Sequence, residues 1–135
     1  MRKIDLSRLL ILSLVFLFMA AACDSDEETY KLSGTITKSG VADGTTVYIK
    51  LVDEGDDLYS EPLYSAEATF SSNSASYTIS GIEAGDYNLF AFINVATGGE
   101  SSVPDSGDYV TSFDVSINGD KTVDISEDYW IVYQP

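Results

Sequence analysis

Oxygen-bearing side chains are concentrated in two stretches of this 135-residue sequence, and such stretches are suited to binding hard cations. Calcium takes about six to eight oxygen ligands, which loops rich in Asp, Asn and main-chain carbonyls supply. One stretch is Asp53-Glu-Gly-Asp-Asp57, and the other runs from Asn94 to Asp108. The candidate calcium ligands are Asp53, Asp56, Asp57, Asn94, Asp105 and Asp108. Solvated turns, in which the Asp side chains bond to their own main chain, are the alternative interpretation.

The remaining composition excludes most other chemistry. The sequence has no histidine, so it has no Ser-His-Asp triad, no Cys-His pair and no histidine metal ligand. A formal net charge of −15 disfavours nucleic acid as a partner, because phosphate binding requires Lys and Arg. A single cysteine cannot form an internal disulfide. We therefore expect a protein that is not an enzyme, needs no cofactor other than the calcium considered above, and binds no nucleic acid.

Aromatic residues provide a second candidate site, a contact surface formed by Phe90, Phe92 and Trp130. If the alternating apolar residues of the strand expected at 86–95 face the core, Phe90 and Phe92 point to the outer face of the same sheet. Exposed apolar patches commonly mark contact sites. Cover by the chain's last residues or by the 95–107 loop is the favoured alternative, and Trp130 is then a packing residue.

The elements that must position these residues are strands. Residues with high β-propensity, such as Val, Ile, Thr and Tyr, dominate the sequence after residue 23, and no segment there has helical periodicity. Asn118-Gly119 predicts a hairpin turn. Strands are expected at 30–38, 45–52, 58–71 (interrupted by Pro62), 75–80, 86–95, 109–117, 121–125 and 130–133. This spacing predicts an all-β fold, an antiparallel two-sheet sandwich of about seven strands.

The first 22 residues have the pattern of an export signal. Basic residues precede an apolar run of about 14 residues, shorter than the roughly 20 needed to span a bilayer, and the run ends in small residues. Ala20-Ala-Ala-Cys23 resembles the lipobox of bacterial lipoproteins. The resemblance implies that residues 1–22 are removed and that Cys23 carries the acyl chains that anchor the protein to a membrane. An ordinary signal peptide with an incidental cysteine is the alternative.

Residues 23–29 join this anchor to the domain expected over residues 30–135. The run Asp24-Ser-Asp-Glu-Glu28 repels itself and predicts a solvated tether. Asp directly after the lipidated Cys resembles the inner-membrane retention signal of enterobacteria. A Ser/Asp/Glu-rich run resembles the surface-export signal of Bacteroidota lipoproteins. We expect the outer membrane or cell surface rather than the inner membrane.

The domain itself resembles the carboxypeptidase regulatory-like domains, which are prealbumin-like (transthyretin-like) β-sandwiches. The resemblance rests on an apolar strand, a Gly-containing turn and then Gly85-x-Tyr87-x-Leu89-x-Ala91, which opens the next strand. It covers residues 30–125 and implies a non-catalytic accessory module.

Two functions are compatible with these patterns. The first is an accessory binding module of the cell envelope that contacts an unidentified protein or glycan. The second is a purely structural envelope or surface-coat lipoprotein, stabilised by calcium if the acidic loops bind it.

Overall fold

The fold is a sandwich of two β-sheets. The computed structural model describes residues 27–96 and 103–135, so the leader, Cys23 and most of the acidic tether lie outside the described residues. The elements are β1 (Thr29–Thr37), β2 (Thr46–Asp53), β3 (Tyr64–Thr69), β4 (Ser74–Glu83), β5 (Gly85–Ile93), β6 (Tyr109–Ile117), β7 (Lys121–Thr122), the 3₁₀ turn η1 (Glu127–Tyr129) and β8 (Ile131–Val132). In these two described ranges, no helix is long and apolar enough to cross a membrane.

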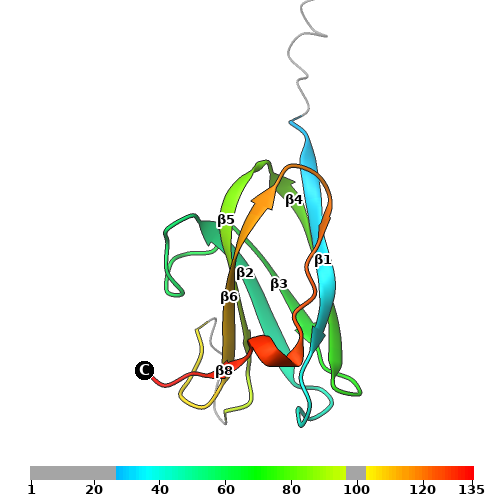
Figure 1. The fold of residues 1–135 in the computed structure, drawn as a ribbon, viewed down its shortest axis with the longest axis vertical. Coiled ribbons are helices and arrows are strands. Elements are labelled where there is room, and N and C mark those ends of the chain that lie inside the picture. The colour runs from blue at the N-terminus through cyan, green and yellow to red at the C-terminus, as the bar shows by residue number, and fades with distance from the viewer. Residues whose placement is uncertain (1–26, 97–102) are drawn as a thin grey trace, which may run out of the picture.

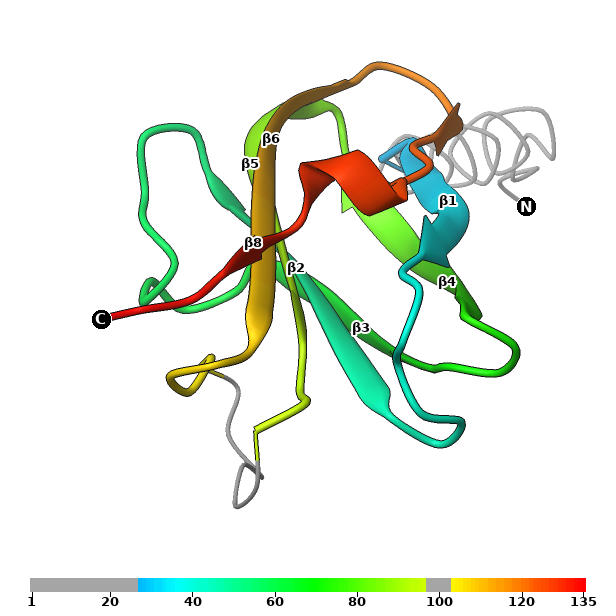
Figure 2. The same ribbon diagram turned by 60° about the horizontal axis from the view of Figure 1, so that its bottom comes forward.

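The strands divide unequally between the two layers, as Figures 1 and 2 show. One sheet has the order β4-β1-β7, and the other has the order β3-β2-β5-β6-β8. Pairing is antiparallel except between β1 and β7, which run parallel. The expected all-β, two-sheet sandwich is therefore confirmed, with eight strands over the described part of the chain.

The core lies between the sheets and follows the predicted alternation. Leu32 and Ile36 of β1 are fully buried against alternating residues of the larger sheet. Those partners are Val47, Ile49 and Leu51 of β2 and Tyr87, Leu89, Ala91 and Ile93 of β5. Period-two burial of this kind is what a strand presents when one of its faces packs on a second sheet.

The expected hairpin at Asn118-Gly119 is wrong. The chain turns there, but it then crosses from the larger sheet to the smaller one, where β7 pairs in parallel with β1. Beyond β7, Val123 N–H donates to the Ser33 carbonyl at 2.8 Å, and Ile125 N–H donates to the Thr35 carbonyl at 2.9 Å. This crossing buries Ile125 completely. A hairpin back along β6 would forgo that burial and leave the edge of β1 unpaired.

Two carboxylates complete the edge of β1. Asp120 accepts the main-chain N–H of Lys31 at 2.9 Å, and Asp124 accepts the N–H of Thr35 at 2.8 Å. Asp120 and Asp124 are four residues apart, and so are Lys31 and Thr35, whose N–H groups they accept. Residues 120–125 thus act as a complete edge strand for β1 although only Lys121 and Thr122 have strand geometry.

The crossing requires a glycine at position 34. A Cβ atom placed on Gly34 would lie 1.9 Å from the Val123 carbonyl oxygen, a distance at which one of the two segments must move. The Tyr77 hydroxyl donates to the same carbonyl at 2.7 Å, which fixes the oxygen in place. Gly34 therefore sets how closely the C-terminal segment approaches β1.

Replacing this glycine tests the crossing. We expect Gly34→Ala to lower the free energy of unfolding by about 1–3 kcal/mol, because the added methyl group overpacks the contact with Val123. Gly119→Ala is the matched control, since nothing lies within 4 Å of a Cβ at that position. Urea unfolding of both variants measures the difference. Equal midpoints for the two variants would contradict the close approach.

Candidate functional site

Part of the outer face of the larger sheet is buried rather than open to solvent. Phe92 is only 2% exposed, and its ring stacks on Tyr48 of β2 with centroids 4.9 Å apart. Val52 and Val110 on the same face are buried as well. Phe92 therefore does not offer the contact surface expected from the sequence, while Phe90 remains half-buried.

The cover of this face is the loop between β2 and β3, residues 54–63. The Lys50 ammonium donates to the main-chain carbonyls of Leu58 and of Ser60, the latter at 3.1 Å. Burial lowers the pKa of Lys50, while Asp57 and Glu61 act in the opposite direction. A charge buried in this way stays in place because carbonyl dipoles solvate it. The sequence argument had considered the 95–107 loop as cover, and residues 97–102 of that loop lie outside the described residues.

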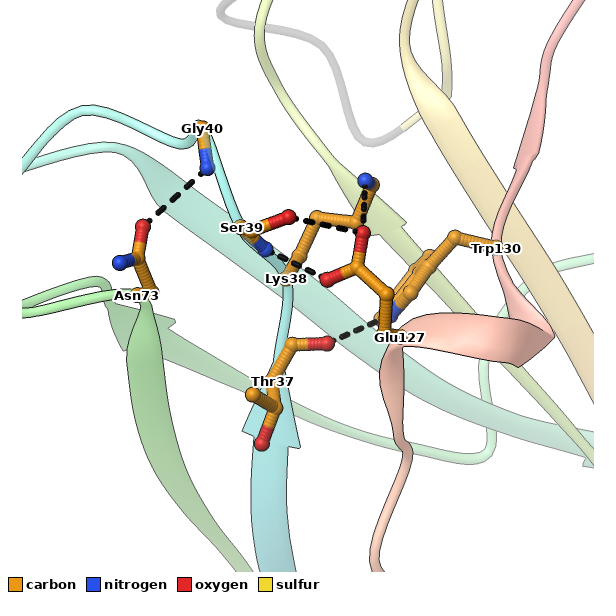
Figure 3. A network of polar contacts seen from close by, with 7 residues as sticks. All are labelled: Thr37, Lys38, Ser39, Gly40, Asn73, Glu127 and Trp130. Carbon is orange, nitrogen blue, oxygen red and sulfur yellow. Dashed lines mark hydrogen bonds and ion pairs between the residues drawn. The ribbon is translucent and has the colours of Figure 1, made fainter.

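Trp130 is part of the core and not of a surface. Its side chain is 8% exposed, and its indole N–H donates to the Thr37 carbonyl at 3.2 Å. Beside it, Glu127 of η1 pairs with Lys38 at 2.5 Å and accepts the Ser39 N–H at 2.6 Å (Figure 3). The packing alternative for Trp130 is therefore the one that the geometry favours. Together these contacts fasten the turn η1 to the end of β1.

An apolar cavity of about 450 Å³ opens between this C-terminal segment, β6 and the 54–63 loop. We call it the apolar cleft. Its lining residues are Leu58, Phe90, Val110, Thr111, Ser112, Phe113, Tyr129, Ile131 and Tyr133. Its size falls within the range of small-molecule and peptide side-chain pockets, and its side chains carry no formal charge at neutral pH. Of the aromatic residues expected at a contact surface, Phe90 alone lines it.

Two aromatic contacts shape the mouth of the apolar cleft. The hydroxyl groups of Tyr59 and Tyr133 contact each other and join the 54–63 loop to the C-terminal segment. The ring of Tyr129 packs edge-on against Phe113, with centroids 5.1 Å apart and an interplanar angle of 75°. The apolar cleft is not evident from the sequence patterns, although the consecutive apolar residues Ile131, Val132 and Tyr133 near the chain end are a signal for it.

Two of the acidic residues proposed as calcium ligands, Asp57 and Asp108, accept main-chain N–H groups of their own loops. Asp108 is 1% exposed, and its carboxylate accepts the N–H groups of Val95, Ala96 and Asp105 at 2.8–2.9 Å. Asp57 accepts the Tyr59 N–H at 2.9 Å. In the first stretch, Asp53 and Asp56 are exposed, and Asp105 is also exposed.

Calcium binding by these residues stays a prediction from the sequence. In the described ranges, no three acidic, His or Cys side chains come together in an arrangement that could hold a metal ion. Asn94 directly follows β5 and precedes Val95 and Ala96, whose N–H groups Asp108 accepts. The turn interpretation thus accounts for Asp57 and Asp108 without a metal.

Calcium is tested by comparison with magnesium. We expect millimolar calcium and magnesium at equal ionic strength to raise the melting temperature by the same small amount, because both screen the repulsion among the carboxylates. Differential scanning fluorimetry measures both shifts. A clearly larger shift with calcium would contradict this expectation and restore the calcium site.

The Lys38–Glu127 pair makes stability depend on pH. Lys38 and the N–H of Ser39 hold the pKa of Glu127 below its ordinary value of 4.5. A lowered folded-state pKa stabilises the protein above the unfolded value, and this contribution is lost as the pH falls through the folded value. We expect the melting temperature of Glu127→Gln to fall below that of the native chain above pH 4.5 and to converge with it in more acidic buffer.

The exposed neighbour Asp128 provides the control for that experiment, since Asp128→Asn changes the same charge without touching Lys38. A constant difference between Glu127→Gln and the native chain at every pH would argue against the ion pair.

Comparisons with known proteins add little to this geometry. No protein-family model matches the chain, and no curated protein does. Among solved structures, the chain is similar to a DUF3823 family protein from Parabacteroides merdae, with 18% sequence identity and a TM-score of 0.41. The match covers 80% of this chain and 48% of that one, so this chain spans about half the length of that protein.

Proposed function

We propose that the chain is a lipid-anchored lipoprotein of the bacterial cell envelope whose sandwich is a non-catalytic accessory binding module. The observation that carries the binding role is the apolar cleft, an uncharged cavity in a chain with a formal net charge of −15. A purely structural or coating sandwich has no need of such a cavity. The absence of histidine from the sequence and the lack of a clustered metal-ligand set in the described ranges favour binding over catalysis.

The anchor is proposed at Cys23, on the basis of its lipobox-like context. β1 begins at Thr29, six residues after Cys23, so the first strand lies within about 20 Å of the acylated residue. In the ribbon, the start of β1 lies at the same end as the β4–β5 and β6–β7 turns (Figure 1). That end would face the membrane, and the acidic run after Cys23 favours the outer membrane or cell surface.

The start of β6 lies at the opposite end of the sandwich, since Ile117 pairs with Gly85 and Tyr109 pairs with Ile93. The lining residues Val110 to Phe113 are therefore in the half of the sandwich farther from the anchor. A binding site in that half remains accessible on an anchored protein.

We also assign the sandwich to the carboxypeptidase regulatory-like, prealbumin-like class. Support comes from the motif Gly85-x-Tyr87-x-Leu89-x-Ala91 at the start of β5. The side chains of Tyr87, Leu89 and Ala91 are buried in the core. The Tyr87 hydroxyl donates to the Glu83 carbonyl at 2.7 Å across the turn, and burial, together with the neighbouring Tyr64 hydroxyl, raises the pKa of Tyr87 to about 12.

Metabolic labelling with a palmitate analogue tests the anchor. We expect the full-length chain, expressed in a bacterium with lipoprotein processing, to take up the label and to stay with the membrane fraction. Cys23→Ala should abolish the label, because it removes the thiol to which the acyl chain is attached.

Ser25→Ala is the matched control, since it alters the tether and leaves the lipobox-like run intact. Unlabelled native protein, or label that persists in Cys23→Ala, would overturn the lipid anchor.

A further inference from the structure

The strand β6 has an unfinished edge. β5 pairs with β6 along its whole length, from Tyr109 to Ile117. On the other side, β8 pairs only with Tyr109 and Val110. From Thr111 onward, no strand in the described ranges continues the pairing that β8 begins.

Main-chain donors and acceptors point to this open side. Tyr133 N–H donates to the Asp108 carbonyl at 2.7 Å. Alternate residues of a strand direct their N–H and C=O groups to the same side, so every second residue of β6 after Asp108 faces the side on which β8 lies. Those residues include Ser112 and Asp114, which lie beyond the end of the β8 pairing. The next residue that faces this side is Ser116, and its carbonyl already accepts a hydrogen bond from the Lys121 ammonium at 3.0 Å. Ser112 and Asp114, two alternate residues of β6, thus present an unused hydrogen-bonding edge.

The apolar cleft lies along the same edge. Its lining includes the four consecutive residues Val110 to Phe113. Consecutive side chains of a strand point to opposite faces, so a cavity that touches all four reaches around the edge of the strand. The open main chain of Ser112 and the apolar cavity are parts of one surface.

We infer that this surface binds an extended polypeptide segment of a partner protein, which adds a strand to β6 in line with β8. The inference rests on the proposed accessory binding role and specifies its partner. In strand addition, main-chain hydrogen bonds supply affinity and pockets for alternate side chains supply specificity. Here, Ser112 and Asp114 offer the main-chain bonds, and the apolar cleft takes the apolar side chains.

Charge determines which extended segment fits. Asp57, Asp114 and Asp128 each adjoin a lining residue in sequence, while the lining itself carries no formal charge. The partner segment should therefore combine apolar residues with Lys or Arg. A second copy of this chain would bring its own net charge of −15 to the same edge, which opposes self-pairing.

A synthetic peptide of alternating Val and Lys is the probe. The full-length chain is held in nanodiscs of zwitterionic phosphatidylcholine, so that the lysines meet no lipid headgroup with a net negative charge. We expect saturable binding by calorimetry that weakens with salt, together with slower amide hydrogen exchange at Ser112 and Asp114. A peptide with proline at alternate positions, which cannot complete the ladder, should not bind.

Neighbouring residues of β8 supply matched variants. Ile131 lines the apolar cleft and is 66% exposed, whereas Val132 is 50% exposed and does not line it. We expect Ile131→Ser to weaken binding roughly tenfold, through the loss of apolar burial. Val132→Ser should bind the peptide as the native chain does.

The main-chain contribution is tested at Ser112. Ser112→Pro removes the N–H that faces the open side and leaves the ladder to β5 intact, so it should abolish binding. Ser112→Ala removes the same side chain but keeps the N–H, so the further loss of binding in Ser112→Pro measures the main-chain contribution. If Ser112→Pro does not fold, strand addition is still tested by amide exchange at Ser112 and Asp114 and by the comparison of Ile131→Ser with Val132→Ser.

Several results would overturn strand addition. One is that the proline peptide binds with the same affinity as the Val-Lys peptide. A second is that amide exchange at Ser112 and Asp114 does not change when peptide is added, and a third is that Ile131→Ser and Val132→Ser weaken binding equally. A glycan that occupies the apolar cleft in place of the peptide, or a dimer formed through this edge of β6, would also contradict it. Lipid labelling at Cys23 is measured separately. Loss of peptide binding with label retained therefore removes this inference alone, whereas bound peptide without label removes only the anchor.

Discussion

The passage of the Val123 carbonyl directly over Gly34 is the contact on which the C-terminal segment depends. At that point the chain leaves the turn after β6 and joins the edge of β1, where Tyr77 holds the carbonyl in place. The downstream contacts follow in order: Ile125 enters the core, Glu127 pairs with Lys38, Trp130 enters the core, and β8 pairs with β6. The C-terminal segment thereby links the edges of both sheets and forms one wall of the apolar cleft.

The opposite wall depends on a buried charge. Lys50 lies on the outer face of β2, where a long side chain ordinarily reaches water, and its ammonium instead ends on carbonyls of the 54–63 loop. The loop contributes Leu58 to the apolar cleft. Removal of the ammonium would leave those carbonyls without their donor, and an unmet buried acceptor is costly. One lysine thus ties the outer-face cover to the sheet beneath it.

Local patterns in the sequence predicted the strands well because alternation is a short-range property. Val47, Ile49 and Leu51 face the core as their spacing required, and so do Tyr87, Leu89 and Ala91. Asn118-Gly119 led to a wrong prediction of a hairpin because its turn chemistry is local. The following strand pairs with β1, which is distant in the sequence: Thr35 of β1 lies 89 residues before its partner Asp124. Pairing over that separation leaves no trace in a window of ten residues.

The candidate sites were harder to predict for the same reason. Outward Phe92 was identified correctly as an outer-face residue, but its cover comes from Tyr48 on a neighbouring strand and from a loop fixed by Lys50. Asp108 suited a cation by composition, and its three main-chain donors became evident only with the fold. The apolar cleft joins the 54–63 loop, β6 and the chain end, which are far apart in the sequence.

The tie between the C-terminal segment and β1 is tested most directly by native-state amide hydrogen exchange. Val123 and Ile125 donate to β1 carbonyls and Tyr133 donates to Asp108, so these three amides should exchange as slowly as those in the middle of β2 and β5. Fast exchange at Val123 and Ile125, with the rest of the sandwich protected, would contradict the account. It would show that the last residues do not hold the two sheets together and do not form a stable wall of the apolar cleft.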